Sequence, residues 1–216
     1  MSGDRHSQAD PVELIKDPDE KARREAENGV RQFNAALDVI RTYLENPERP
    51  FKLTQGLILR LHQEALAGIH PLAGTYRNSP VFIQQSQHKP PLHHDVPDLV
   101  AEMCDYVNQN WGDRNAVHLA AYILWRMNWI HPFADGNGRT ARVVSYVVLS
   151  AKLHSLLPGT PTIPDQIAAD KTPYYTALEK SDDSWKREII ALTDMEGMLE
   201  GMLANQLLSA TQEASA

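Results

Sequence analysis

Two apolar helical stretches with a polar twelve-residue segment between them, HPFADGNGRTAR, constrain this fold more than any other feature. Residues 119 to 130, before that segment, are apolar on nearly every side of a helix, which is the pattern of a central, buried helix. Residues 139 to 153, which begin in the last part of that segment, contain β-branched residues that favour strand. They run without a break for longer than a usual strand, however, and Asn137 or Gly138 can begin a helix there. We therefore expect two core helices joined at a polar corner.

Helical spacing of apolar side chains predicts further helices around this pair. In the first, near the N-terminus, the spaced side chains are Val30, Phe33, Leu37 and Ile40. Thr54 is a suitable N-cap for the second. The predicted helices are residues 17–44, 55–66, 99–107, 119–130 and 139–153, the stretch YYTALEKSD and a terminal helix from 184 to about 208, with LPGTPTIP as a loop.

A single short stretch favours extended structure. The segment from Gly74 to Pro97 contains four prolines from Pro80 onward, and within it only Val81 to Ile83 have strand preference. We predict an all-α fold with one short β-hairpin. At 216 residues the chain is long enough for one core, and we divide it into an N-terminal extension and helix (1–49), a core domain (50–190) and a C-terminal helix and tail (191–216).

Composition excludes several classes of protein. Cys104 is the only cysteine, so neither an intrachain disulfide nor a cysteine-rich zinc site can form, and we expect it to be a small buried hydrophobe. The formal charge of -7 provides no domain-wide basic field for nucleic acid. No apolar run is long enough to span a membrane, and the first residues lack the apolar core of a secretory signal. We expect a soluble, cytoplasmic protein that binds neither nucleic acid nor membrane.

The polar corner has the residues of an anion-binding site. Gly136 and Gly138, on either side of Asn137, allow successive backbone N–H groups to point at one anion, and a helix N-terminus adds partial positive charge. Arg139 and Arg142 stand three residues apart on the first turn, where two guanidinium groups can hold neighbouring phosphates. Positive side chains there oppose the helix dipole, so we expect an anion to compensate them.

Two more residues indicate chemistry at this corner. Asp135 precedes the loop, and an acid beside a phosphate site indicates that Mg²⁺ lies between them. His131 ends the preceding helix, and an imidazole with an ordinary pKa of about 6.5 can take a proton from a hydroxyl at neutral pH. A base, a metal ligand, an anion site and two arginines together indicate attack on a nucleotide phosphate.

Two other patterns have simpler interpretations. GNGRTA fits the dinucleotide fingerprint G-x-G-x-x-G/A, but that fingerprint follows a strand and requires an acid about 20 residues on. Here a helix precedes it, and the next acid, Asp165, lies beyond a proline-rich loop. His88, His93, His94 and Asp95 lie in a proline-rich loop without cysteines, and we interpret them as solvated loop residues and not as metal ligands.

HPFADGNGRTAR matches, position for position, the HPFx(D/E)GNGRxxR signature of the Fic domain family. The resemblance extends beyond it: GTYRNSPVFI resembles the flap hairpin of that family, PPLHHDVPDLVAEM is similar to the segment after the flap, and YYTALEKSDD resembles the helix that borders the nucleotide base. Together these stretches cover roughly residues 50 to 190. A mainly helical Fic-type fold is therefore expected.

The resemblance implies a protein adenylyltransferase, which transfers AMP from ATP to a Ser, Thr or Tyr hydroxyl of a target protein and releases pyrophosphate. It implies that His131 is the general base and that Asp135 holds Mg²⁺. Phe133 would anchor the loop. The nucleotide contacts that it implies are Gly136, Asn137 and Gly138 at the α-phosphate, Arg139 and Arg142 at the distal phosphates, and Tyr174, Tyr175, Leu178 and Asp182 near the base.

The resemblance also implies two ways in which other polypeptide reaches the site. The flap at Val81, Phe82 and Ile83 would align an extended target segment by strand addition. Family members are often inhibited by a helix with the pattern [S/T]xxxE[G/N], whose glutamate pairs with the second motif arginine. This chain has no clean copy of that pattern, and our candidate is Glu27, although Arg23 stands where Ser or Thr is expected. The C-terminal alternatives are Glu196 and Glu200.

Three classes of function remain open at this point. The first is AMP transfer, the second is transfer from another donor such as UTP or a nucleotide-linked choline, and the third is nucleotide binding without catalysis. The intact GNGRxxR favours a triphosphate donor, and the intact His131 argues against a non-catalytic protein. The expected partners are a target protein with an acceptor hydroxyl and an antitoxin-like inhibitor protein, and the oligomeric state is left open.

Overall fold

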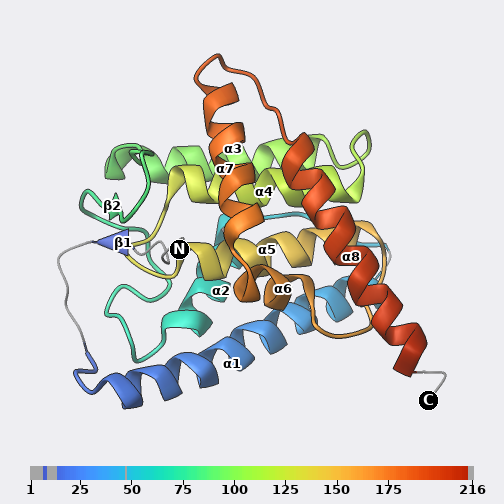
Figure 1. Ribbon diagram of the computed structural model, residues 1–216, viewed down its shortest axis with the longest axis horizontal. Coiled ribbons are helices and arrows are strands. Elements are labelled where there is room, and N and C mark those ends of the chain that lie inside the picture. Colours follow the sequence, from blue (N-terminus) through green and yellow to red (C-terminus); the bar gives the residue numbers. More distant parts are fainter. Residues whose placement is uncertain (1–6, 9–13, 47, 214–216) are drawn as a thin grey trace.

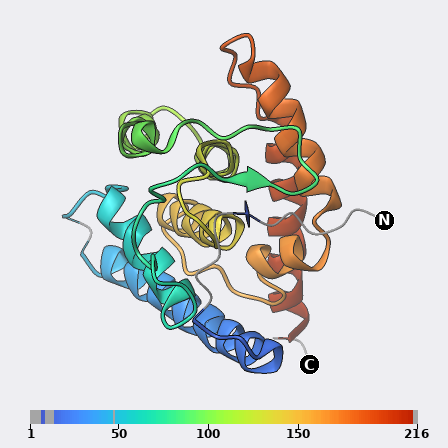
Figure 2. The same ribbon diagram turned by 90° about the vertical axis from the view of Figure 1, so that its left-hand side faces the viewer.

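The computed structural model describes residues 7–8, 14–46 and 48–213, and within these ranges it contains eight α-helices and one two-stranded sheet. Helices α4 (Ala116–Ile130) and α5 (Asn137–Lys152) lie side by side at the centre (Figures 1 and 2). Nearly every residue of α4 is buried, and α5 is buried from Val143 to Ala151. The predicted pair of core helices is confirmed, and the helical reading of the valine-rich stretch was correct.

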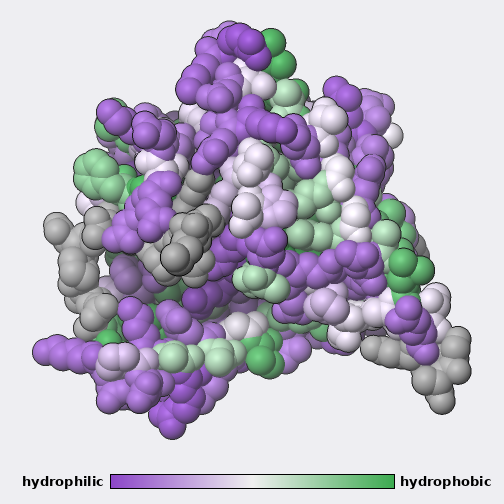
Figure 3. Space-filling model, in the orientation of Figure 1, coloured by the Kyte–Doolittle hydropathy of each residue, from purple (hydrophilic) through white to green (hydrophobic). Residues whose placement is uncertain are grey.

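The other helices surround this pair. Helices α1 (Pro18–Leu44) and α2 (Gln55–Leu66) pack on α5, and α3 (Val96–Gln109) packs on α4. Helices α7 (Thr172–Trp185) and α8 (Thr193–Glu213) also pack on α4, while α6 (Ile163–Ala169) joins α5 to α8. A short 3₁₀ turn, η1 (His93–Asp95), leads into α3. No helix within the described ranges is long and apolar enough to cross a membrane, and hydrophilic residues dominate the face in Figure 3.

Polar side chains decide which face of α1 is buried. Asn28 Nδ2 donates to the carbonyl oxygens of Ala65 and Ala67 (3.2 and 2.9 Å), and Gln32 Nε2 donates to that of Leu61 (3.1 Å). These bonds replace those that the end of α2 would otherwise make with water. Val30, which we placed on the apolar face, is 64% exposed. The prediction was wrong there because a periodicity of apolar residues alone ignores buried amides.

Two helix boundaries also differ from the prediction. Helix α6 begins at the end of the predicted loop LPGTPTIP and continues beyond it, with a capping box in which Thr162 and Asp165 satisfy each other's backbone N–H groups. The predicted terminal helix from Ser184 to Leu208 is two elements, because α7 ends at Trp185 and α8 begins at Thr193. The backbone reverses between them, with Glu188 at a φ of 59°.

The predicted hairpin is not formed. Phe82 and Ile83 make strand β2, which pairs antiparallel with β1 (Ser7–Gln8) and not with the residues that follow it. The chain turns directly after β2, since the Ser86 N–H donates to the Ile83 carbonyl (3.3 Å) and Gln85 has a φ of 58°. A return strand therefore does not form. The edge of β2 is paired instead with β1, which lies near the N-terminus of the sequence.

Candidate active site

One cavity opens where the ends of α4, α5 and α7 meet the loop after β2. It contains every residue predicted to act on the nucleotide: His131, Asp135, Gly136, Asn137, Gly138, Arg139, Arg142, Tyr174, Tyr175, Leu178 and Asp182. Of the predicted flap, Ile83 lines the cavity, whereas Val81 is buried in the protein and Phe82 is 69% exposed. The lining residues that the sequence did not predict are Ser86, His88, Asn128, Trp129 and Lys171.

His131 is the residue that ends α4, and its backbone is left-handed (φ 52°). An L residue rarely adopts this conformation without support. The support is Arg77, a buried arginine whose Nε donates to the His131 carbonyl (2.8 Å) and whose Nη2 donates to the carbonyls of Pro91 (2.6 Å) and Ile130 (3.4 Å). Sequence reasoning missed Arg77, because it lies within a stretch that we read only as flap.

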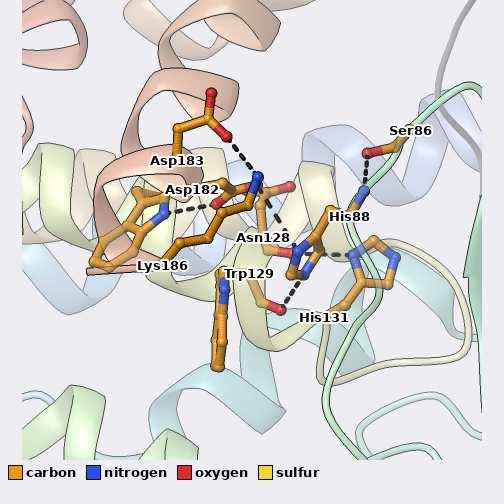
Figure 4. Close-up of polar contacts among 9 residues, drawn as sticks. Ser86, His88, Asn128, Trp129, His131, Asp182, Asp183 and Lys186 are labelled. Atoms are coloured by element: carbon orange, nitrogen blue, oxygen red, sulfur yellow. Dashed lines mark hydrogen bonds and ion pairs between the residues drawn. The ribbon is translucent and has the colours of Figure 1, made fainter. Parts of the chain in front are cut away.

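The protonation state of His131 suits a base. Its Nδ1 lies 3.4 Å from the Asn128 carbonyl oxygen, which can only accept, so Nδ1 carries the hydrogen and Nε2 keeps its lone pair (Figure 4). Burial lowers the pKa of His131 to about 3, and the charge of Arg77 acts in the same direction. The imidazole is therefore neutral at neutral pH, and its unprotonated nitrogen is Nε2.

Side-chain bonds within the motif segment (residues 131–142) hold its loop in shape. The Asn137 amide bonds to both backbone groups of Phe133, accepting from N (2.8 Å) and donating to O (2.8 Å). Asp135 Oδ1 accepts from the Gly136 N–H (2.7 Å). Gly136 has a φ of 74°, and a Cβ there would lie 2.5 Å from the Leu66 side chain. The Asn137 side chain thus shapes the loop, a role that we did not predict.

The two arginines approach the loop from the first turn of α5. A Cβ on Gly138 would lie 3.6 Å from Arg142 Nη1, so the Arg142 side chain folds back over the glycine. Arg139 Nη1 donates to the Ala65 carbonyl (3.4 Å), and its Nη2 lies 3.7 Å from Glu25 Oε1. The guanidinium groups and the N-terminus of α5 give this wall of the cavity its positive charge.

His62 of α2 supports the loop from behind. Its Nδ1 accepts from the Gly74 N–H (3.0 Å), so its Nε2 donates to the Asp135 carbonyl (3.0 Å). Its ring stacks on Phe133 with 3.7 Å between centroids, which agrees with the expected anchoring role of that phenylalanine. Burial lowers the pKa of His62 to about 4. A histidine within an amphipathic helix was the only signal in the sequence, and we did not use it.

Helix α7 forms the opposite wall. Tyr174 is buried, and its hydroxyl accepts from Asn128 Nδ2 (2.5 Å), while Asp182 Oδ1 accepts from Trp125 Nε1 (2.9 Å). Leu178 is buried as well. These contacts fix α7 against α4. The α7 wall of the cavity therefore presents the side chains of Tyr174 and Leu178, with the Asp182 carboxylate further along the helix.

His88 does not fit our interpretation of a solvated loop histidine. Its side chain is only 13% exposed, its Nε2 donates to the Trp129 carbonyl (2.7 Å), and its Nδ1 lies 3.9 Å from Asp182 Oδ2 (Figure 4). The long-range contact with α4 draws it into the cavity. No group of three histidine, cysteine or acidic residues in the described part of the chain could hold a metal ion.

Glu25 of α1 lies beside one of the motif arginines, Arg139. The predicted inhibitory residue, Glu27, is 55% exposed, and its Oε2 lies 3.8 Å from Arg24 Nε. Glu196, one of the C-terminal alternatives, lies 2.7 Å from His118 Nδ1. The inhibitory role of Glu27 stays a prediction, and Glu25 joins it as a candidate.

The cavity lining contains two carboxylates, and Asp135 is the one that belongs to the motif segment. Magnesium usually takes one or two carboxylates and completes its shell with waters and substrate phosphates. Asp135 lines the same cavity as Gly138 and Arg142, so a nucleotide phosphate bound there would stand next to it. The residues present therefore fit Mg²⁺ bound together with a nucleotide.

Comparison with known proteins identifies similar sequences and similar folds. The Fic/DOC family model matches residues 52–149. A protein adenylyltransferase Fic from Nematostella vectensis is 35% identical over 94 residues, which are 43% of this chain and 22% of that protein. This chain thus spans about a fifth of the length of that curated relative.

Two solved structures share the fold. Fic-1 from C. elegans has a TM-score of 0.66 and 21% identity, covering 88% of this chain and 52% of that one. The BepC protein from Bartonella tribocorum, solved with bound AMPPNP, has a TM-score of 0.59 and 15% identity, covering 87% and 88%.

Proposed function

Residues 52–149 of this chain form a Fic/DOC family domain, and from this premise we propose that the protein transfers AMP from ATP to a hydroxyl group of a target protein. The observation that carries the proposal is a neutral buried histidine in the same cavity as a glycine-rich helix N-terminus and two arginines. That combination is suited to attack by a hydroxyl on a bound phosphate. Dinucleotide binding is not favoured, because a helix, α4, precedes the GNGRTA stretch.

The acceptor oxygen attacks the α-phosphorus of ATP. A new bond forms between oxygen and phosphorus, the bond to the bridging oxygen breaks, and pyrophosphate leaves with that electron pair. The acceptor proton passes to His131 Nε2, the nitrogen that the Asn128 contact leaves unprotonated. Arg77 acts as a positioning residue, because it holds the backbone of His131.

The nucleotide would be held along the cavity from α5 to α7. The backbone N–H groups of Asn137 and Gly138 would bind the α-phosphate, since that of Gly136 donates to Asp135 Oδ1, and Arg139 and Arg142 would bind the distal phosphates. Mg²⁺, held by Asp135, would neutralise phosphate charge. The remaining wall, Tyr174, Tyr175, Leu178 and Asp182, would contact the base. The likeness to a structure that holds AMPPNP supports a triphosphate donor.

Labelled ATP tests this proposal directly. A lysate incubated with the protein, Mg²⁺ and ATP labelled at the α-phosphate should yield labelled proteins, whereas ATP labelled at the γ-phosphate should yield no more labelling than the kinases of the lysate give without the protein, because pyrophosphate carries that label away. Parallel reactions with labelled UTP and CDP-choline compare other donors. Protein labelling from the γ-phosphate above that of the lysate alone, or equal α-phosphate labelling by wild type and His131→Ala, would be incompatible with AMP transfer by this site.

A further inference from the structure

A second cavity of about 420 Å³ opens between α3, α4 and the end of α7. Its lining shares no residue with that of the candidate active site. The residues that decide its chemistry are Glu102 and Asp105 of α3, Tyr122, Trp125 and Arg126 of α4, and Trp185 of α7. The steps proposed for AMP transfer use none of these side chains, so this cavity has no role in that proposal.

Arg126 is a buried arginine in the lining of this cavity. It is 5% exposed, and its Nε and Nη1 atoms are buried without a hydrogen-bond partner among the described residues. Burial lowers the pKa of Arg126 and the charge of Glu102 opposes that shift, but a guanidinium stays protonated at neutral pH. Because buried charged donors without acceptors cost free energy, a bound acceptor would stabilise this residue.

The neighbours of Arg126 determine which acceptor suits it. Its Cζ lies 4.3 Å from the ring centroid of Trp129 and 4.7 Å from that of Trp185. These rings stabilise the positive charge, but they offer no lone pair to the N–H groups, which lie in the plane of the guanidinium. Arg77, which is also buried, donates instead to backbone carbonyl groups such as that of His131. A carboxylate, which accepts two parallel bonds from a guanidinium, is the ligand group that matches Arg126.

The rest of the lining indicates what the carboxylate is attached to. Glu102 and Asp105 bring two carboxylates and Arg126 brings one guanidinium, so the lining has an excess of one negative charge. That balance disfavours a phosphate dianion and favours a ligand with an ammonium group beside its carboxylate. Tyr122 and Trp125 are buried and give an apolar surface to the remainder of the ligand. These are the three parts of an α-amino acid with an apolar side chain.

We infer that this second cavity binds a free α-amino acid with an apolar side chain. The carboxylate of the ligand accepts from Arg126, and its ammonium group donates to Glu102 and Asp105. The ligand side chain packs against Tyr122 and Trp185. The inference does not depend on the proposed function, because it concerns binding in a cavity that is separate from the candidate active site.

The test measures binding to the full chain without ATP. L-Leucine, L-methionine and L-phenylalanine are each titrated by calorimetry and by tryptophan fluorescence, since the ring centroids of Trp125, Trp129 and Trp185 lie within 5.7 Å of Arg126 Cζ. We expect saturable binding of at least one of them. The corresponding amine without the carboxylate, and the corresponding acid without the amino group, should each bind about tenfold more weakly or worse, because each leaves a charge of the cavity unmatched. Absence of binding by all three amino acids, or equal binding of an amino acid and its amine, would overturn the inference.

Substitutions locate the binding in this cavity. Arg126→Met should weaken it by about tenfold or more, while thermal unfolding stays close to that of wild type, because Nε and Nη1 lose no hydrogen bond. Glu102→Gln should weaken it by about threefold. The matched control is Asp98→Asn, which neutralises another exposed carboxylate of α3 outside the cavity lining and should bind as wild type does.

Two results would contradict the inference. The first is wild-type affinity in folded Arg126→Met. The second is equal affinity of Glu102→Gln and Asp98→Asn, and this comparison decides the matter if Arg126→Met does not fold.

Discussion

The two sides of the cavity are built in different ways. The anion side, the motif segment at residues 131–142, is shaped by bonds between neighbours, such as those of Asn137 with Phe133 and of Asp135 with Gly136. The acceptor side, residues 82–88, is shaped by contacts with distant parts of the chain, such as β1 with β2 and His88 with Trp129. A short sequence pattern can therefore specify the first side, whereas only the folded chain specifies the second.

Arg77 joins the two sides, and its removal should have the largest effect on stability. Arg77→Met leaves the carbonyls of His131 and Pro91 without their donor in a buried place, so we expect unfolding to cost roughly 3 kcal/mol less. Thermal and denaturant unfolding measure this change. The control is Arg31→Met, whose exposed pair with Glu64 should contribute less than about 1 kcal/mol. Equal effects of the two substitutions would mean that Arg77 does not clamp the site.

His62, which supports the motif segment from behind, should make the free energy of unfolding depend on pH. The pKa of His62 is lowered to about 4 in the folded protein, so below its ordinary value of about 6.5 the unfolded chain binds a proton that the folded chain does not. Stability from this group is complete above about pH 6.5 and falls as the pH drops toward 4, by about 3 kcal/mol in total.

Replacing His62 isolates that contribution. Unfolding free energies measured between pH 7 and pH 4 should fall less steeply in His62→Gln than in wild type, because glutamine cannot take up the proton. His94→Gln, at a histidine that is 66% exposed, should keep the wild-type dependence. A His62→Gln curve parallel to that of wild type would show that this histidine is not held neutral behind the loop.

The anion side should distinguish nucleotides by their phosphates. Because Arg139 and Arg142 are proposed to bind the distal phosphates, Arg139→Ala should weaken ATP binding by roughly 1.5 to 3 kcal/mol and AMP binding far less. Titration calorimetry with both nucleotides measures the difference. If ATP and AMP lose affinity equally, the arginine serves the α-phosphate or the loop itself and not the distal phosphates.

The smallest effect should come from α1. Glu25→Gln removes the 3.7 Å pair with Arg139, and since both side chains are about one-third exposed, ATP affinity should rise by no more than about 1 kcal/mol. Glu27→Gln, two residues along the same helix, should leave ATP affinity unchanged. If automodification or ATP affinity rises for Glu27→Gln alone, the inhibitory residue is the one that the sequence pattern suggested.

The same contrast explains how much the sequence could predict. Helices α1 to α5 followed from apolar periodicity and the motif residues of the cavity from one dense segment, because a buried helix and a glycine-rich turn are determined locally. The predicted α7 residues of the cavity came only from the family resemblance. The hairpin was wrong, since strand preference at Val81 to Ile83 does not say which segment will pair with it. Arg77, His62 and His88 were missed for a related reason, because the carbonyl groups to which they donate lie between 41 and 73 positions away in the sequence.

The account is tested most directly by comparing the effect of His131→Ala on ATP binding with its effect on AMP transfer. ATP binding by calorimetry and AMP transfer by mass spectrometry are measured on the same preparations of wild type, His131→Ala and the control His94→Ala. Because the histidine handles the acceptor proton and not the phosphates, the account predicts nearly unchanged ATP affinity with transfer lowered by about 10²- to 10⁴-fold, and no loss in the control. Transfer that persists in His131→Ala, or that is lost only in proportion to ATP affinity, would contradict the assignment of His131 as the base.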